Sequence, residues 1–437
     1  MSIVRESRDF DQEVVIVGVG HVGLTLAMAL CRKGFTVLGI DINQRLVSDL
    51  NSGITHVTEQ GINDELIGYL KVKRFNVVHT KANWSRSNKP ITFILTVGTP
   101  LVGSQMDLTA IKKSLGNIAP YLIDGDLLIL RSTVAVGTSR ELVKPYVDNL
   151  NKRVLIAMCP ERTVEGNALV EIENLPQVIG GIDRESAKSA ELFFSNICKK
   201  TILLSSIESA ELLKLANNTY RDLMFAYANE LTSLAEKIGI SSREIINAAN
   251  HDYPRSMIAQ PGPSGGPCLE KDPWILHYSG LQVGVEMYLS KAARTVNERS
   301  TYNFVKDIVK NIWDDNKNLK LGILGLSFKG SPQVKDSRGS FSKGLIDFLK
   351  PMNLDILGFE PAGEIEPLIP NLKIAKDLTQ VLEECNVVIV ATNHDSFKQI
   401  PELIKGLQGK AALTLVDMWS LVDSSVLPDN VEYKSWG

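Results

Sequence analysis

The residues with the clearest chemical potential lie in one stretch, Gln260–Pro273, which is rich in glycine and proline. Such a composition cannot continue a helix or a strand, so we expect a tight loop. The loop presents Cys268 directly after a Gly-Gly-Pro turn, and Pro267 suits the first position of a helix. Cys268 would then lie in a first helical turn, three residues before Lys271, where a thiol ionises below its usual pKa of about 8.5. A buried cysteine in a glycine turn is the alternative, but the flanking residues favour a covalent nucleophile.

Helices are expected on both sides of this loop. Asp272 and Pro273 are typical of an N-cap and a first helical residue. Upstream, apolar residues recur at a spacing of three to four between Ser206 and about Ile238, which predicts one long helix. These residues are Leu213, Ala216, Tyr220, Leu223, Tyr227, Leu231, Leu234 and Ile238. At 1.5 Å per residue the helix is roughly 50 Å long, enough to span two domains and to supply a dimer face. Lys214 and Asn218 lie one turn apart on its flank, between a cofactor domain and the cysteine loop.

The first part of the chain has the pattern of a dinucleotide site. A short apolar strand at 13–17 is followed by a glycine turn, a helical pattern and a second strand that ends on Asp41. The glycines allow the backbone to approach a pyrophosphate at the helix N-terminus, and the acid accepts hydrogen bonds from a ribose diol. An acid here repels a 2′-phosphate, so NAD is expected rather than NADP. The predicted cofactor contacts in this motif are Gly18, Gly20, His21, Val22, Gly23 and Asp41.

Further strands at 91–97, 126–131 and 154–159 alternate with helices. In open α/β sheets the carboxyl ends of the strands line the ligand site. Residues that directly follow these strands are therefore predicted at the site, and they are Ser132, Thr133, Glu161 and Glu165. The two glutamates would share a face if their segment were helical. Solvated surface charge is the alternative for both.

The last part of the chain repeats the order of the first. A strand at 319–326 leads into a glycine turn, a helix and a strand that ends on Glu360, and strands at 386–391 and 413–417 follow. This half lacks a GxGxxG motif, so a different nucleotide is expected there. Charged residues in the segment after its first strand could meet anionic groups or could be ordinary surface charge, and they are Lys329, Lys335, Asp336 and Arg338.

Composition excludes several classes of function. The 437 residues carry a net charge of −3 with 44% hydrophobic residues, so no electrostatic footprint for nucleic acid or an anionic membrane is present. No apolar run approaches the roughly 18 residues that span a bilayer, and the charged N-terminus does not resemble a signal peptide. The sequence has five cysteines without a CxxC pair and six scattered histidines. This pattern argues against a disulfide framework and against a metal site. We therefore expect a cytoplasmic protein.

Together these motifs resemble the UDP-glucose/GDP-mannose dehydrogenase family, the nucleotide-sugar 6-dehydrogenases, over essentially the full length. The matching residues are Gly18-x-Gly20-x-x-Gly23, Val97-Gly-Thr-Pro100, Ser132-Thr-Val-x-x-Gly-Thr138, Pro160-Glu-x-x-x-Glu165-Gly166, Glu211-x-x-Lys214-x-x-x-Asn218, Gly265-Gly-x-Cys268-x-x-Lys-Asp272 and Gly325-Leu-Ser-Phe-Lys329. So many ordered motifs are highly specific. The resemblance implies two Rossmann-like doubly wound parallel-sheet domains joined by a helical region. We place the NAD-binding domain at 1–205, the helical dimerisation domain with the Cys loop at 206–314, and the UDP-sugar-binding domain at 315–437.

The resemblance also implies a mechanism. The sugar C6 alcohol gives a hydride to NAD, and Cys268 adds to the resulting aldehyde as a thiohemiacetal. A second oxidation leaves a thioester, which water hydrolyses to a uronic acid with help from Glu161 or Glu165. Lys214 and Asn218 stabilise the oxyanion, while Asp272 and Thr133 position water and assist proton transfer. The other implied contacts are Thr99, Thr133 and Arg338 to the cofactor and Glu161, Arg162, Lys214, Asn218 and Lys329 to the UDP-sugar. Members are typically cytoplasmic dimers or higher oligomers.

The sequence departs from the family pattern at Pro263, where members often carry another glycine. Lys271-Asp272 resembles the UDP-glucose branch. Pro160-Glu-Arg162-Thr, Leu175–Gly181 and Asp272-Pro-Trp274 resemble the branch that oxidises UDP-N-acetylhexosamines. This favours an N-acetylated sugar, and specifically UDP-N-acetylmannosamine. UDP-N-acetylglucosamine, its galacto epimer and UDP-glucose stay open.

Two other functions fit part of the sequence. A two-electron β-hydroxyacid-type dehydrogenase shares the first fingerprint and a helical Lys-x-x-x-Asn pair, but it gives no role to Cys268 or to the second α/β half. A non-catalytic NAD-binding protein has no use for a thiolate. The number of NADH molecules made per substrate separates the three hypotheses, since they predict two, one and none.

Overall fold

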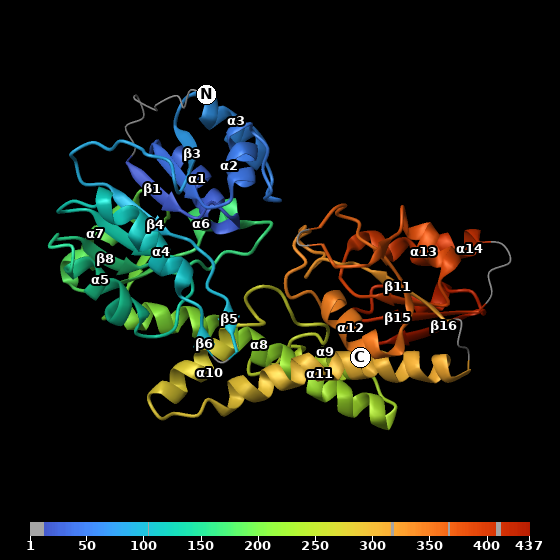
Figure 1. Ribbon diagram of the computed structural model, residues 1–437. Helices are drawn as coiled ribbons and strands as arrows, with labels where there is room; N and C mark the ends of the chain where they lie inside the picture. The colour runs from blue at the N-terminus through green and yellow to red at the C-terminus, as the bar shows by residue number, and fades with distance from the viewer. Residues whose placement is uncertain (1–12, 104, 316–318, 366–367, 408–411) are drawn as a thin grey trace. The chain divides into compact units, whose positions relative to one another are not determined.

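The computed structural model describes residues 13–103, 105–315, 319–365, 368–407 and 412–437 (Figure 1). The chain divides into two compact units, 1–217 and 218–437. Each unit contains one large sheet between layers of helices, and each is described by itself. The predicted division into three domains stays a prediction.

The sheet of unit 1 has eight strands in the order β10-β9-β8-β7-β4-β1-β2-β3, and all neighbours are parallel except β8 and β9. The strands are β1 (Val14–Val17), β2 (Val37–Asp41), β3 (Phe75–His79), β4 (Thr92–Leu95), β7 (Leu127–Leu130), β8 (Leu155–Met158), β9 (Gln177–Gly181) and β10 (Thr201–Leu203). A small antiparallel pair, β5 (Leu101–Val102) and β6 (Gln105–Met106), follows β4. Side chains of a strand alternate between the two faces, and both faces of β1 are covered. Val14 and Ile16 lie in one core cluster, whereas Val15 and Val17 lie in another.

The helices of unit 1 connect these strands. They are α1 (His21–Arg32), α2 (Gln44–Asn51), α3 (Ile62–Lys71), α4 (Thr109–Ile118), α5 (Lys144–Asp148), α6 (Ala168–Asn174) and α7 (Arg184–Ser195). Leu24, Ala27 and Met28 of α1 are completely buried because this helix packs on the centre of the sheet. The chain adds strands β2 and β3 on one side of β1 and then returns to add β4 on the other side. Ligands of doubly wound sheets bind at this change in strand order.

The sheet of unit 2 is entirely parallel, with the order β13-β12-β11-β14-β15-β16. The strands are β11 (Lys320–Leu324), β12 (Asp355–Phe359), β13 (Lys373–Ile374), β14 (Val387–Val390), β15 (Leu413–Asp417) and β16 (Val431–Ser435). Helices α12 (Phe341–Leu349), α13 (Leu378–Glu384) and α14 (Ile400–Gly406) cover it. Numbered within this half, the strand order is 3-2-1-4-5-6. The fold class predicted from the sequence, two doubly wound parallel-sheet domains, is therefore confirmed.

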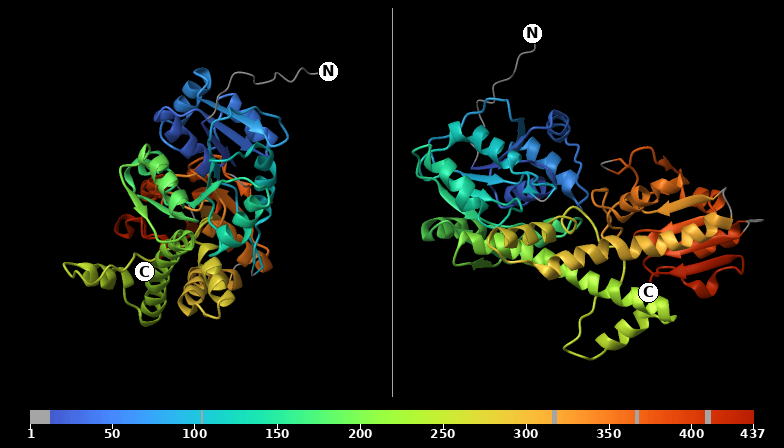
Figure 2. Two further views of the ribbon diagram at one scale, coloured as in Figure 1. Left: turned by 90° about the vertical axis from the view of Figure 1, so that its left-hand side faces the viewer. Right: turned by 60° about the horizontal axis from the view of Figure 1, so that its bottom comes forward.

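Long helices precede the second sheet. They are α8 (Ile207–Ile238), α9 (Ser242–Asn250), α10 (Asp272–Gln282) and α11 (Tyr288–Asp315). The long helix predicted at 206–238 is thus confirmed to within one residue. In unit 2, α11 lies along the second half of α8 (Figure 2), and Asn297 donates hydrogen bonds to Asp222 of α8. None of the helices in the described ranges combines the length and apolarity needed to cross a membrane.

The apolar stripe that predicted α8 is mostly exposed in the structure. Tyr220, Tyr227 and Leu234, seven residues apart, are 57%, 53% and 60% exposed. The buried side of the helix carries polar residues instead, and these are Glu211, Lys214, Asn218, Thr219, Asp222, Asn229 and Thr232. Buried polar groups require hydrogen-bond partners, and loop residues supply them for Glu211 (Gly137 and Ser139) and for Asn229 (Gly262).

Candidate active site

The glycine turn between β1 and α1 has the geometry of a phosphate-binding turn. Gly18 has φ +92°, which favours glycine, and a Cβ on Gly23 would lie 2.0 Å from the Gly18 carbonyl oxygen. A Cβ on Gly20 would meet nothing within 4 Å. Gly20 is also the N-cap of α1, and no side chain caps the helix there. The first turn of α1 therefore faces open space with uncapped N–H groups, so these residues fit the pyrophosphate of a dinucleotide.

Asp41 lies beside this turn at the end of β2. One carboxylate oxygen accepts a hydrogen bond of 2.9 Å from the Val19 N–H, and the other accepts one of 2.9 Å from the Asn43 N–H. The carboxylate is thus tied to the glycine turn, while the residue stays partly exposed. This is the position from which an acid contacts a ribose diol.

The corresponding acid of unit 2, Glu360, is used differently. One carboxylate oxygen accepts hydrogen bonds from the N–H groups of Leu326 and Ser327 at 2.7 and 2.9 Å and from the Ser327 hydroxyl at 2.6 Å. The other oxygen lies 2.9 Å from Nε2 of His394, and both of these side chains are buried. Burial acts to raise the pKa of Glu360, but the hydrogen bonds and charge of His394 and the Ser327 hydroxyl lower it overall. Glu360 thus organises its own turn and does not face a ligand as Asp41 does.

His21, in the glycine motif, lies between two carboxylates. Its Nε2 is 3.4 Å from Glu59, and its Nδ1 is 3.8 Å from Glu165. Glu59 also accepts a hydrogen bond of 2.6 Å from the Gly166 N–H, which ties the segment after β8 to the glycine turn. Glu165 therefore lies beside the predicted cofactor turn.

Glu161 lies in a separate buried cluster. Arg131 Nε donates to its carboxylate at 2.8 Å, and another nitrogen of the same guanidinium donates to Gln177 at 2.9 Å. The Thr163 N–H donates to Glu161 at 2.8 Å. Burial acts to raise the pKa of Glu161, but the charge of Arg131, the hydrogen bonds of Thr163 and the charge of Lys214 lower it to about 2. Glu161 is therefore ionised at any physiological pH.

The condition under which Glu161 and Glu165 would share a helical face is not met. The segment from Cys159 to Val164 is irregular, and the next helix, α6, begins only at Ala168. Pro160 cannot donate the hydrogen bond that a continued helix would need. The two carboxylates consequently turn to different partners, Arg131 and His21.

The first turns of α8 support the loop after β7. Glu211 is completely buried and accepts hydrogen bonds from the N–H groups of Gly137 and Ser139 at 2.6 and 2.8 Å. Burial raises the pKa of Glu211. In the same loop, the carbonyl oxygen of Thr133 accepts a hydrogen bond of 2.6 Å from the Thr99 hydroxyl. Thr99 and Thr133, both predicted to contact the cofactor, thus lie together in unit 1.

Lys214 and Asn218 lie one turn apart on the buried side of α8, at 8% and 7% exposure. The Asn218 amide donates a hydrogen bond of 2.5 Å to the carboxylate of Asp272, and the Lys271 ammonium lies 3.0 Å from the other oxygen. Asp272 is completely buried. Asp272 and Asn218, two predicted catalytic residues far apart in the sequence, are therefore direct partners.

The cysteine loop differs in detail from the sequence-based expectation. Pro267–Lys271 forms turns rather than a helix, since the Cys268 carbonyl accepts from the N–H groups of Lys271 and Asp272. Helix α10 begins at Asp272, and Lys271 is its N-cap without a side-chain hydrogen bond. Asp272 therefore does not cap the helix, because its carboxylate is turned to Asn218. Cys268 is exposed, and the other cysteines, Cys31, Cys159, Cys198 and Cys385, are buried.

Two segments of unit 2 contact the cysteine loop from the side of the second sheet. The Gly266 N–H donates to the Gly339 carbonyl at 2.7 Å, and a Cβ on Gly266 would lie 2.7 Å from the Phe328 ring. Lys329 directly follows that ring, with its ammonium 5.5 Å from the ring centre. The structure therefore brings the Lys329 segment next to the loop that carries Cys268.

Two predicted contact residues have partners of their own. Arg338 is exposed, and its Nε lies 3.0 and 2.9 Å from the two carboxylate oxygens of Asp336. The Arg162 guanidinium donates to the carbonyl of Pro176, and burial lowers its pKa. Their predicted roles stay predictions.

Some residues of the site were not predicted. In unit 1 they are Glu59, Arg131 and Gln177, and in unit 2 they are Asp222, Asn229, Arg294 and Asn297. The signal for Arg131 was its place directly before Ser132 at the end of a strand. Polar residues inside the predicted apolar pattern of α8 were the corresponding signal for Asp222 and Asn229.

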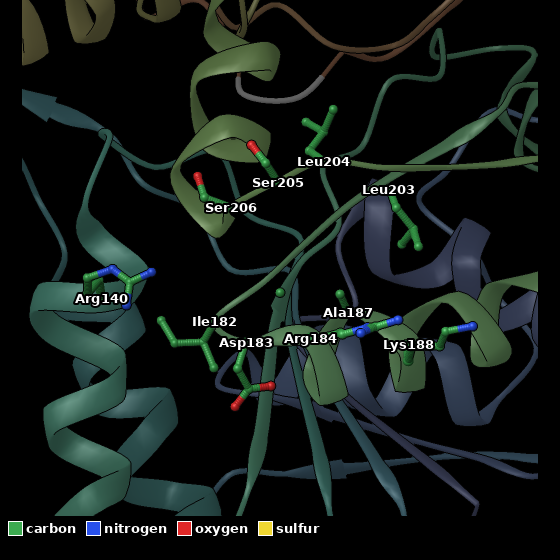
Figure 3. Close-up of a pocket in the computed structure, with 11 residues that line it drawn as sticks. Arg140, Ile182, Asp183, Arg184, Ala187, Lys188, Leu203, Leu204, Ser205 and Ser206 are labelled. Atoms are coloured by element: carbon green, nitrogen blue, oxygen red, sulfur yellow. The ribbon is translucent and has the colours of Figure 1, made fainter.

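A separate hollow of about 350 Å³ lies at the other edge of unit 1, next to β9 and the beginnings of α7 and α8 (Figure 3). Arg140, Arg184 and Lys188 line it together with Asp183, and Arg140 is paired with Glu208. The hollow contains none of the predicted site residues.

The buried ion pair of Glu161 predicts a large effect on stability. Glu161→Gln leaves the buried Arg131 guanidinium without its counter-charge, which should lower the free energy of unfolding by about 3–5 kcal/mol. Glu185→Gln is the matched control, because Glu185 pairs with Arg153 at an exposed site, and it should change stability by at most about 0.5 kcal/mol. Urea unfolding followed by circular dichroism measures both. Equal effects of the two variants would contradict the assignment.

The same pair predicts acid sensitivity. Because the folded pKa of Glu161 is about 2 and its ordinary value is 4.5, its contribution to stability is complete above about pH 4.5 and is lost as the pH falls towards 2. Glu161→Gln should therefore flatten the pH dependence of unfolding in this window. Parallel curves for the parent protein and the variant would show that the carboxylate is not held ionised.

Comparisons with known proteins agree with this architecture. The models of the UDP-glucose/GDP-mannose dehydrogenase family match the chain in three segments: the NAD-binding domain at 12–198, the central domain at 208–299 and the UDP-binding domain at 322–424. The UDP-N-acetyl-D-mannosamine dehydrogenase of Campylobacter jejuni is 32% identical over 413 residues, which cover 89% of this chain and 97% of the relative. The enzyme of the same name from Methanococcus vannielii is 30% identical over 412 residues, covering 91% of each chain.

Solved structures show the same likeness. The structure described as UDP-D-ManNAc dehydrogenase from Pyrococcus horikoshii superimposes with a TM-score of 0.82 at 25% identity, and the match covers 97% of this chain and 98% of the other. The glycine turn and Asp41 fit a dinucleotide, and the family models assign this half to NAD. The chain therefore belongs to the UDP-glucose/GDP-mannose dehydrogenase family and is an NAD-dependent oxidoreductase that acts on a nucleotide sugar.

Proposed function

We propose that this enzyme oxidises the C6 alcohol of UDP-N-acetyl-D-mannosamine to the carboxylate in two successive two-electron steps, with Cys268 as covalent nucleophile. The observation that carries the proposal is the exposed Cys268 thiol on a loop that continues into Lys271 and Asp272, with the buried Asp272 carboxylate held by Asn218 of α8. An exposed thiol beside fixed cationic and hydrogen-bonding groups suits nucleophilic chemistry, whereas a structural cysteine is normally buried.

The proposed cofactor site consists of residues of unit 1. The glycine turn holds the pyrophosphate, Asp41 holds the adenosine ribose, and Thr99 and Thr133 line the strand ends beside it. NAD, when bound, supplies the hydride acceptor for both oxidations. Arg338 is a cofactor contact expected from the family resemblance alone. His21 and Glu165 orient the turn, since they are paired with each other beside it.

The residues of this chain perform the covalent steps. The Cys268 sulfur attacks the carbonyl carbon of the C6 aldehyde, and the electron pair of the C=O bond moves to oxygen. Lys214 and Asn218 stabilise that oxyanion. After the second oxidation, water attacks the thioester carbon and the C–S bond breaks to return the thiolate. Thr133 and Asp272 position this water, and Asp272 assists the transfer of its proton.

The low pKa of Glu161 argues against a role as general base. A base with a pKa of about 2 accepts a proton poorly near pH 7. The charge of Lys214 lies close enough to help lower the pKa of the Glu161 carboxylate. We therefore propose that Glu161 orients Lys214 and the substrate and that proton transfer falls to Asp272 or Glu165.

The choice of sugar depends on sequence features and on the names of relatives. Pro160-Glu-Arg162-Thr and Asp272-Pro-Trp274 favour an N-acetylated sugar, and both relatives described above are named for UDP-N-acetyl-D-mannosamine. UDP-N-acetylglucosamine, its galacto epimer and UDP-glucose are the alternatives. Lys329 is the proposed contact to the UDP moiety. A cysteine that acts as a thiol suits the reducing cytoplasm, where we place the enzyme.

The deciding experiment incubates the purified protein with NAD and one sugar at a time from a panel of UDP-hexoses and UDP-N-acetylhexosamines. NADH is counted by absorbance, and consumed sugar and product acid are counted by mass spectrometry. We expect UDP-N-acetylmannosamine to be the best substrate and to give two NADH per sugar. One NADH per substrate would favour a two-electron dehydrogenase, and none with any sugar would contradict the function.

Cys268→Ala should abolish formation of the acid while NAD binding is retained, because the aldehyde can no longer be held covalently. Cys198→Ala is the control, since that cysteine is buried and lies outside the proposed chemistry. Product acid and the dissociation constant of NAD are measured for both variants. Full activity of Cys268→Ala would exclude the thiol as nucleophile.

Replacement by alanine should impair NAD binding at one glycine of the β1–α1 turn and protein stability at another. Gly20→Ala should leave thermal stability unchanged but weaken NAD binding by about tenfold or more, because its methyl group enters the space that the pyrophosphate approaches. Gly23→Ala should lower stability by about 2 kcal/mol or more, because its Cβ would lie 2.0 Å from a backbone oxygen. Fluorescence titration with NAD and thermal unfolding give the two readouts. Normal NAD affinity in Gly20→Ala would contradict the pyrophosphate assignment.

We further propose that two copies of the chain associate through the exposed stripe of α8. Tyr220, Tyr227, Leu234 and Ile238 recur along one face of this helix and are all more than half exposed. Apolar residues repeated every seven positions on an exposed helix are typical of helix–helix association.

Glutamate at two positions of this stripe tests the dimer. The double change Tyr227→Glu and Leu234→Glu should give a monomer in sedimentation velocity at micromolar concentration, whereas the parent protein sediments as a dimer or larger. Leu192→Glu is the control, because Leu192 is 72% exposed but lies on α7. A monomeric parent protein, or a double variant that still dimerises, would refute this interface.

A further inference from the structure

The segment Pro261–Leu269, which carries Cys268, has no helix or strand hydrogen bonds of its own. Its backbone polar groups must therefore find partners elsewhere. Side chains from α8 and α11 supply several of these partners, and all of them lie in unit 2.

The Asn229 side chain on α8 is completely buried, and it forms hydrogen bonds with both the carbonyl and the N–H of one loop residue. Its amide nitrogen donates to the Gly262 carbonyl at 3.0 Å, and its oxygen accepts from the Gly262 N–H at 3.0 Å. The same nitrogen donates to Asn297 at 3.0 Å, and the same oxygen accepts from the Trp436 indole N–H at 2.9 Å. Two donors and two acceptor sites are the full capacity of a side-chain amide. The orientation of Asn229 is thus determined by four partners.

A second group of contacts lies on the other side of the loop. The buried Asp222 carboxylate is 3.3 Å from the Ser264 hydroxyl and 2.7 Å from an Arg294 nitrogen. That nitrogen also donates to the Leu269 carbonyl at 3.0 Å. Asn297 donates to Asp222 at 2.8 Å and so connects it to Asn229. The anchors at 262, 264 and 269 therefore flank Cys268 in the sequence.

Trp436 connects this network to the second sheet. It follows β16 directly, and its backbone N–H donates to the Asp417 carbonyl oxygen at 3.0 Å. Its ring is 2% exposed and packs against Phe304 of α11 with ring centres 5.0 Å apart. The indole N–H is therefore held in place towards Asn229.

We infer that Asn229 is a positioning residue for Cys268 and that the Trp436 indole N–H keeps it in its productive orientation. The network acts through the backbone of Gly262 and not on the substrate. A loop rich in glycine loses more freedom on ordering than other segments, so its geometry depends on these contacts. The catalytic part of this inference rests on the proposed function.

Trp436→Phe tests the inference with a small change. It keeps an aromatic ring against Phe304 and removes the N–H, which leaves one acceptor site of the buried Asn229 oxygen without a partner. Tyr433→Phe is the matched control. Tyr433 lies on β16, the strand that precedes Trp436, and this change removes one side-chain hydrogen bond to Asp417 without affecting the contacts of Asn229. Amide hydrogen exchange of the full-length protein is followed at Gly262 and Gly266, together with kcat and KM.

We expect Gly262 to exchange about tenfold faster or more in Trp436→Phe, and kcat to fall at least threefold while the dissociation constant of NAD stays unchanged. Tyr433→Phe should match the parent protein in all of these. A network that only adds stability would lower the unfolding temperature without this split between kcat and NAD binding. Exchange at Gly262 within twofold of the parent protein, or an unchanged kcat, would overturn the inference.

A second variant covers the case in which Trp436→Phe does not fold. Asn229→Asp retains the acceptors for Gly262 and Trp436 but loses both donors, and it should likewise accelerate exchange at Gly262. Asn51→Asp is its control, because Asn51 makes the same two-point contact to the backbone of Val77 in unit 1. If the parent protein oxidises no UDP-sugar, the proposed function fails, and the exchange rates alone decide whether Asn229 holds the loop.

Discussion

The buried polar side of α8 is the constraint on which the proposed active site depends. Glu211, Asn218, Asp222 and Asn229 follow one another at intervals of seven, four and seven residues, so they lie on one side of the helix. Glu211 binds the loop after β7, Asn218 binds the first residue of α10, and Asp222 and Asn229 bind the Cys268 loop. Each of the four is at most 7% exposed. A buried polar group without a partner costs more free energy than its hydrogen bond contributes, so helix and loops specify one another's geometry. The exposed side of the same helix carries Tyr220, Tyr227, Leu234 and Ile238.

The two sheets share a topology but use their corresponding acids in different ways. Asp41 accepts two backbone hydrogen bonds and stays partly exposed beside an uncapped helix N-terminus. Glu360 is buried beneath His394 and beneath the turn at Leu326, from whose N–H it accepts a hydrogen bond. A ligand can therefore contact the carboxylate in the first half, whereas in the second half the carboxylate only shapes the turn. The same strand order thus supports two different modes of nucleotide binding.

The carboxylates near the end of β8 show how the environment separates residues of one type. Glu161 is desolvated but paired with Arg131, and its pKa falls to about 2. Glu165 lies next to His21 on the glycine turn. Four positions of sequence separate them, yet one is a fixed charge next to Lys214 and the other belongs to the cofactor side. For Glu161, Coulombic pairing in a buried site is strong enough to exceed the cost of burial.

The sequence by itself determined the fold class, the glycine turn with Asp41, the long helix and the loop with Cys268. These features depend on local periodicity and on glycine and proline, whose effects act within a few residues. Strands β9 and β16 were not predicted: β9 ends in two glycines, and β16 alternates Val, Glu, Tyr, Lys and Ser without a buried apolar run. Their place at the sheet comes from pairing with neighbours that are distant in the sequence.

Only the tertiary structure decided how the site residues are paired. Asp272 was expected to cap α10, but the amide of Asn218 holds its carboxylate instead. The local pattern marked Arg131 and Asn229 only by their positions and did not identify their partners, because Glu161 and Gly262 lie 30 and 33 residues away. The partner of Trp436, Asn229, lies 207 residues away. Buried hydrogen bonds and ion pairs form between whichever polar groups the packed elements bring together. The local pattern therefore predicts which elements form, whereas long-range burial determines which polar side chains meet.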